Sequence, residues 1–200
     1  DPGSLVALHG PGSVVSKIEF APGEKINVLG GNFTIDLTGS KLRIGKDRFP
    51  VRTSKMQIEW DAHKATFNIR KTRFQAGSSY ADISGVFVFG LDKSYGPTMR
   101  MSMTLKNIYL RPDDLPPPKA PIENLQFSGW SAPLYGAMGI DKLVATSGDM
   151  KLVTSGRLDM LRAGIGVDLN VAISGASADD LKRLWPYFIG GQTRDWFVQN

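Results

Sequence analysis

Hydrophobic and polar residues alternate along most of this 200-residue chain. The runs "NFTIDL", "SKMQIEW", "ATFNIR" and "MRMSMTLK" repeat with a period of two, which is the spacing of side chains along a β strand. One face of each predicted strand is therefore apolar, and the other is polar. The apolar positions that carry this pattern are Phe33, Ile35, Leu37, Ile58, Trp60, Phe67, Ile69, Met101 and Met103.

Short turn sequences such as "APGEK", "IGKD", "QAGSS" and "YGP" separate these runs, and the chain contains 22 glycines. Consecutive strands with such brief connections pair antiparallel, because a parallel crossover needs about a dozen residues or more. We therefore predict a mainly β fold built as a long antiparallel meander.

The pattern divides the chain into four parts. Residues 1–112 form an amphipathic β meander, residues 113–121 a proline-rich connection, residues 122–176 a second set of strands, and residues 177–200 a helical cap or junction. Proline removes backbone donors and favours extended geometry, so a connection of this kind can join two layers.

The last part changes period. From Ser177 the apolar residues follow a spacing of about 3.6 residues, which predicts a short helix with Ser177 as its N-cap. Pro186 ends or kinks that helix, and "QTRDWFVQN" predicts a second one whose Trp196 points inward. We expect the two pieces to pack Trp185 and Trp196 against one end of the apolar sheet.

The composition of the chain excludes a few kinds of site and segment. The chain has no cysteine, which excludes disulfides and thiolate metal sites, and no apolar run reaches the ~18 residues of a membrane-spanning helix. It begins with Asp and ends within a helical pattern, so we expect it to be a piece of a longer protein. The net charge of +5 divides into +7 for residues 1–112 and −2 for residues 113–200.

The positive charge is concentrated in residues 41–73, which hold ten Lys and Arg against three Asp and Glu. Cations mixed with aromatic residues are typical of nucleic-acid binding, but Arg70 falls on the strand face opposite Phe67 and Ile69. A solvated outer face is the simplest interpretation, and no nucleic-acid partner is expected. Attraction to anionic lipid headgroups or to an acidic protein is the other alternative.

No residue pattern indicates catalysis. The two histidines, His9 and His63, lie in turn-like sequence without a nucleophile signature, and no phosphate-binding or dinucleotide-binding loop is present. We therefore expect no catalytic residue, no metal site and no cofactor, and we do not expect an enzyme.

The apolar strand faces allow two interpretations. They form the core of a closed β module with a structural or docking role, or they line an open, curved groove. Strands of five or six residues span ~17–20 Å, close to the ~15 Å of one bilayer leaflet, so an acyl chain could lie across them.

The closing segment "ADDLKRLWPYFIGGQTRDWFVQN" resembles the Leu-x-x-x-Trp-Pro, spacer, Arg-x-Trp segment of the AsmA-like family of bacterial envelope proteins. The resemblance is to the uncharacterised domain in the central region of the YhdP-type branch. Earlier residues resemble the family only as amphipathic strands with glycine turns. The matching positions are Leu181, Trp185, Pro186, Arg194 and Trp196.

This resemblance implies a function. Such proteins are long, are anchored in the inner membrane outside this segment, and cross the periplasm as a curved sheet with an apolar channel. The resemblance implies guidance of phospholipid towards the outer membrane and support of the permeability barrier. The expected partners are phospholipid acyl chains, with anionic headgroups or envelope proteins as further candidates. The nine apolar positions above are then the candidate lipid-groove residues.

Overall fold

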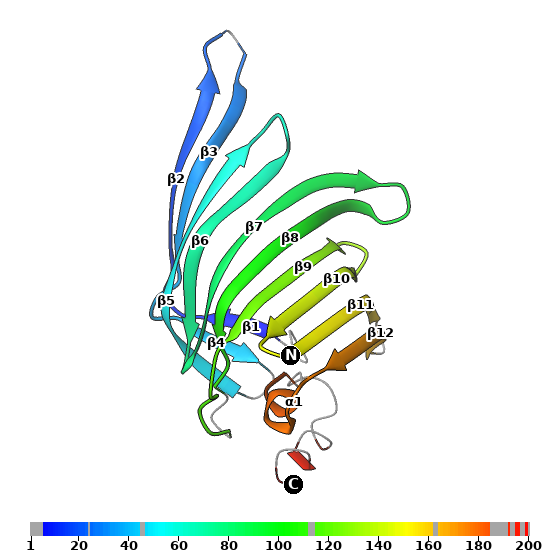
Figure 1. The fold of residues 1–200 in the computed structure, drawn as a ribbon. Helices are drawn as coiled ribbons and strands as arrows, with labels where there is room; N and C mark the ends of the chain where they lie inside the picture. Colours follow the sequence, from blue (N-terminus) through cyan, green and yellow to red (C-terminus); the bar gives the residue numbers. More distant parts are fainter. Residues whose placement is uncertain are drawn as a thin grey trace.

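The computed structural model describes residues 6–23, 25–44, 47–111, 115–161 and 164–184, together with residues 192, 195, 196 and 199. This part of the chain contains twelve β strands followed by one α helix (Figure 1). The elements are β1 (Val6–His9), β2 (Ser13–Ala21), β3 (Asn27–Asp36), β4 (Lys41–Ile44), β5 (Asp47–Asp61), β6 (Thr66–Ala76), β7 (Ser79–Asp92), β8 (Gly96–Tyr109), β9 (Ile122–Ala132), β10 (Ala137–Ser147), β11 (Met150–Leu161), β12 (Gly164–Ser174) and α1 (Ala178–Leu184).

The turns between strands use local hydrogen bonds. Between β7 and β8, the Asp92 carboxylate accepts hydrogen bonds from the backbone N–H groups of Ser94 (2.8 Å) and Tyr95 (3.1 Å). Gly96 follows with a φ of 70°, which glycine adopts without steric cost. Together these features reverse the chain within three residues, as a hairpin requires.

The strands form one open antiparallel sheet, as the alternation predicted. Its order is β1-β4-β5-β6-β7-β8-β9-β10-β11-β12, while β2 pairs with β3 and β3 with β5. The sheet is strongly curved in Figure 1, with the β2–β3 hairpin at one side and β12 at the other.

The proline-rich connection joins neighbouring strands of this sheet. β8 and β9 pair directly, from Met99 opposite Ser131 to Ile108 opposite Ile122. This segment therefore connects two strands of one sheet and does not join two layers. Its prolines remove donors only within the connection itself, and the flanking residues, which keep their N–H groups, continue the ladder.

β1 and β2 are two parts of one long strand that is interrupted between them, and β3 and β4 are two parts of another. β3 lies along the second half of β5, and β4 lies along its first four residues, in the same direction. At the break, the Val51 N–H donates to the Ser40 carbonyl (2.8 Å), and the Gly39 N–H donates to the Val51 carbonyl (2.9 Å). β1 and β2 break at the same level, where Gly10 has a φ of 123°. In Figure 1, β1 and β4 run across the base of the sheet.

The described residues do not form a two-layer core. Their largest fully buried side chains are Val51, Ser40 and Ser54, and most of the buried apolar residues are alanines. A domain built of two packed layers buries large side chains between them. Here Val14 remains 66% exposed and Val171 57% exposed, so most of the sheet is a single layer.

The strands are longer than the five or six residues assumed from the sequence. β5 has 15 residues, and β7 and β8 have 14 each. At about 3.3 Å per residue, 14 residues extend ~46 Å. The apolar surface is therefore wider than one bilayer leaflet, because bulges let the strands continue past positions where the alternation is interrupted.

Helix α1 begins as predicted. The Ser177 hydroxyl accepts a hydrogen bond from the Asp180 N–H (3.2 Å), and the Asp180 carboxylate accepts one from the Ser177 N–H (3.0 Å), which is a capping box. Trp185, which follows α1, lies outside the described residues, and so does most of the second predicted helix. The inward orientation expected for Trp196 is wrong, because this side chain is 65% exposed.

Candidate functional site

One face of the sheet is apolar from β3 to β12, and we call it the apolar face. Directly paired residues of antiparallel strands share a face, so the register can be followed across the sheet. One row of successive partners is Phe33, Ile58, Ile69, Gly85, Met103, Phe127, Leu143, Thr154 and Val171. A second row is Trp60, Phe67, Phe87, Met101, Gly129, Ile140, Gly156 and Leu169.

β-bulges keep these rows in phase. In β10, Ile140 pairs with Gly129 and Leu143 pairs with Phe127. Ile140 and Leu143 are three residues apart, and in a regular strand this odd spacing would place them on opposite faces. A bulge inserts one extra residue into a strand, so both side chains remain on the same face. The sequence "GIDKLVAT" does not alternate strictly for this reason.

The structure brings the predicted groove residues together. Phe33, Ile58, Ile69 and Met103 lie in the first row, and Trp60, Phe67 and Met101 lie in the second. Ile35 pairs with Met56 in a further row, whereas Leu37 lies at the break after β3. All nine predicted side chains are half-buried. They are therefore packed at their sides by neighbouring strands and remain open on top.

An aromatic cluster occupies part of this face. The ring of Phe67 stacks on Trp60 with centroids 5.8 Å apart and meets Phe89 edge to face at 5.3 Å. Phe33 lies 6.5 Å from Trp60 and 6.3 Å from Phe67. Such pairs contribute about 0.5–1.5 kcal/mol each beyond their buried area. Phe89 is still 50% exposed, so no second layer covers this ring of the cluster.

Glycines keep parts of the apolar face flat. A Cβ atom added at Gly129 would lie 2.8 Å from Cζ of Phe127 and would also clash with the Gly139 carbonyl oxygen. At Gly85 the added atom would lie 3.0 Å from Cγ of Met103. The Phe127 and Met103 side chains therefore extend over neighbouring backbone, which gives a smooth surface without a deep pocket.

The opposite face carries the charges predicted to be solvated. Arg70 forms an ion pair with Glu59 on this face, and the two side chains are 61% and 42% exposed. Lys55 is exposed and pairs in the ladder with Asp36. The cations of residues 41–73 that lie on β5 and β6 are thus partly neutralised by nearby carboxylates.

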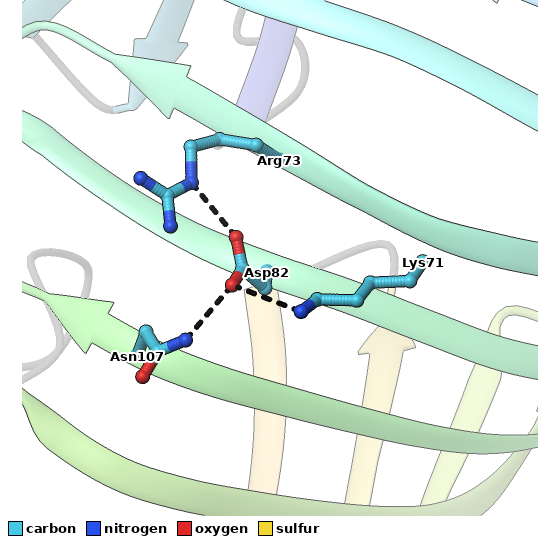
Figure 2. A network of polar contacts seen from close by, with 4 residues as sticks. All are labelled: Lys71, Arg73, Asp82 and Asn107. Atoms are coloured by element: carbon cyan, nitrogen blue, oxygen red, sulfur yellow. Dashed lines mark hydrogen bonds and ion pairs between the residues drawn. The ribbon is translucent and has the colours of Figure 1, made fainter.

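A buried carboxylate on this polar face links three strands (Figure 2). The Asp82 side chain of β7 is only 8% exposed and accepts hydrogen bonds from Arg73 Nε (2.7 Å) and Asn107 Nδ2 (2.9 Å). Lys71 Nζ lies 3.7 Å from the same carboxylate. Two hydrogen bonds, the stronger effect coming from Arg73 and the next from Asn107, lower the pKa of Asp82 from 3.8 to about 2.

The alternation of residues along the chain does not indicate this network, because its members come from β6, β7 and β8. Asn107 has a φ of 51° beside the bulge between Tyr80 and Asp82, which directs its amide to the carboxylate. Asn tolerates the left-handed region better than most residues. The Arg73 guanidinium also lies over the Tyr80 ring at 4.7 Å, and Tyr80 stacks on Tyr109. The network holds β6–β8 together behind the apolar face.

A cavity of about 270 Å³ lies at the base of the apolar face. Leu42 and Phe49 come from the part of the sheet beyond the break, yet they line the same cavity as Ile83 and Leu105. The base of the sheet therefore curls towards its own apolar face. The lining residues are Leu42, Phe49, Phe74, Ala76, Ser79, Tyr80, Ala81, Ile83, Leu105, Ile108, Leu110 and Arg183.

Acidic residues and histidines do not gather into a metal-binding cluster in the described ranges. No three His, Cys, Asp or Glu side chains among these residues lie close enough together to hold a metal ion. His9 ends β1 rather than lying in a turn, and both it and His63 are exposed.

None of the helices in the described segments is long and apolar enough to cross a bilayer.

The residues that carry the family resemblance are only partly described. Leu181 is half-buried in α1, and Trp196 is exposed, whereas Trp185, Pro186 and Arg194 lie outside the described residues. No protein-family model, curated protein or solved structure matches this chain significantly.

Proposed function

We propose that this chain guides phospholipid along its apolar face, as a segment of a longer AsmA-like protein. That protein would be anchored in the inner membrane and would extend through the periplasm towards the outer membrane, where the lipid supports the permeability barrier. The observation that carries the proposal is the apolar face itself. It continues from β3 to β12, and its large side chains are half-buried rather than covered.

The energetics favour an acyl chain as the occupant. Each methylene group removed from water contributes about 0.8 kcal/mol, and this attraction has no preferred direction. An acyl chain on this surface leaves water at every position, while its headgroup remains hydrated at the open side. The free-energy barrier to sliding along the face is then smaller than the free energy needed to remove the lipid from the face into water.

The composition of the face suits sliding rather than tight binding. Met99, Met101 and Met103 line one strand of it, and unbranched thioether side chains adapt to varied partners. The glycines at 85 and 129 remove obstacles between them. No catalytic group is needed, because the lipid moves by contact alone.

The alternative of a closed β module fits less well. A closed module would cover Val14, Phe89 and Val171 with a second layer, yet these are 66%, 50% and 57% exposed. An exposed apolar surface of this extent costs free energy in water unless it meets a ligand or a partner. An acyl chain satisfies this requirement along the whole face.

Photo-crosslinking tests the proposal without disturbing the fold. Met101 lies on the apolar face and is half-buried, whereas its neighbour Ser102 is exposed on the polar face. We expect benzoylphenylalanine at position 101, in cells, to form phospholipid adducts, and the same group at 102 to form few. Equal yields at the two positions would refute the groove.

A functional test uses the same pair. Met101→Asp places a charge on the apolar face, so we expect increased detergent sensitivity of the cells at unchanged protein level. Ser102→Asp is the control, because it adds the same charge to the solvated face. Ile35→Asp provides a second variant at another row of the sheet. Wild-type detergent resistance in both apolar-face variants would contradict lipid conduction.

A further inference from the structure

The cavity at the base of the apolar face differs from the rest of the face in being enclosed on more than one side. Its walls come from β4, the start of β5, the strands β6–β8 and helix α1. Ile83 and Leu105 line it, and they are the next residues on the apolar face beside Gly85 and Met103. The cavity is therefore continuous with the groove and forms its most enclosed part.

Among the described residues that line this cavity, Arg183 is the only one with a charged side chain. Its Nη1 atom donates one hydrogen bond, at 3.4 Å, to the backbone carbonyl of Leu110. Within the described residues, no carboxylate forms an ion pair with it. The Asp180 carboxylate, one helical turn earlier, accepts hydrogen bonds from the Ser177 N–H (3.0 Å) and the Ser177 hydroxyl (2.6 Å).

A guanidinium beside an apolar cavity is suited to an amphiphile. The planar group presents five N–H donors in a fork that matches a phosphate, and within the described residues it donates one hydrogen bond, to the Leu110 carbonyl. A half-buried guanidinium with no carboxylate partner among these residues gains most from a ligand that brings a negative charge and apolar carbons together.

We propose that this cavity is a docking site for an anionic phospholipid, with the phosphate on Arg183 and the acyl chains in the cavity. From there the chains continue past Ile83 and Leu105 onto the apolar face. This inference rests on the proposed function and adds to it a preference for lipid class. The base of the groove selects a net negative headgroup, whereas the rest of the face contacts acyl chains alone.

The test compares two lipids that have the same acyl chains. Native mass spectrometry of the purified full chain measures competition between phosphatidylglycerol, which is anionic, and phosphatidylcholine, which is zwitterionic. Both headgroups carry a phosphate, but in phosphatidylcholine the choline cation neutralises that charge and is repelled by Arg183. We therefore expect the wild type to prefer phosphatidylglycerol about 10-fold. Glycerol 3-phosphate should not displace the lipid, because it lacks an acyl chain.

The variants separate charge from structure. Arg183→Gln can still donate to the Leu110 carbonyl but carries no charge, so we expect it to bind both lipids equally, with phosphatidylcholine affinity within about 2-fold of wild type. Arg183→Lys should keep part of the preference as a point charge. Arg100→Gln is the control, because it removes an exposed cation from the polar face and should leave the preference unchanged.

The outcomes distinguish the two proposals. Equal binding of both lipids by the wild type, or a preference that persists in Arg183→Gln, would overturn the anionic docking site. Displacement by glycerol 3-phosphate would overturn the assignment of the cavity to acyl chains. Failure of the wild type to bind either lipid would count against the groove itself, and with it the docking site.

Discussion

Replacing Asp82 with Asn tests whether the buried carboxylate holds the middle of the sheet together. The Asp82 pKa is lowered from 3.8 to about 2 by its hydrogen bonds to Arg73 and Asn107. At 1.36 kcal/mol per pKa unit, this lowering corresponds to about 2 kcal/mol. The Arg73 and Lys71 side chains are 46% and 70% exposed, so solvent screening reduces this figure to about 1–2 kcal/mol.

The sign of the pH dependence follows from the direction of the shift. A carboxylate whose folded-state pKa is depressed stabilises the protein above its unfolded-state value, and this contribution is lost as the pH falls towards the folded-state value. For Asp82 the contribution is therefore complete above about pH 5 and disappears between about pH 4 and pH 2. Wild type and Asp82→Asn should then converge in stability at the acid end of that range.

Urea unfolding at pH 7 and at pH 2.5 measures this effect. We expect Asp82→Asn to be less stable than the wild type by about 1–2 kcal/mol at pH 7 and by much less at pH 2.5. Asp168→Asn is the control, because this side chain is exposed on β12. An equal difference between wild type and Asp82→Asn at both pH values would refute the reasoning.

Two further variants test packing and capping. Gly139→Ala should displace the Trp130 indole, whose Cδ1 lies 2.9 Å from the added Cβ, and should cost about 1–3 kcal/mol by thermal unfolding, whereas Gly90→Ala has no neighbour within 4 Å and should be nearly neutral. Unchanged tryptophan fluorescence in Gly139→Ala would contradict this packing. Ser177→Ala removes the N-cap of α1 and should cost about 1 kcal/mol, seen as faster hydrogen exchange in α1 with β7 unaffected. Equal exchange in the variant and the wild type would show that the capping box is dispensable.

The sequence by itself determined the strands and their two faces. Alternation has a period of two residues, so it is a local property of each run and needs no knowledge of the partners. For this reason Phe33, Ile58, Phe67 and Met101 could be assigned to a single apolar surface before the fold was known. The capping role of Ser177 was equally local, because its partner Asp180 lies three residues away.

The tertiary structure alone decided how those faces join and where they are enclosed. The register across β-bulges carries the apolar face through "GIDKLVAT", where alternation alone fails. Beyond the break in the first strands, Leu42 lines the same cavity as residues of β6–β8. Helix α1 adds Arg183, which contacts Leu110 from 73 residues further along the chain. Contacts over such separations depend on chain reversal and strand pairing, and no local pattern of residues records them.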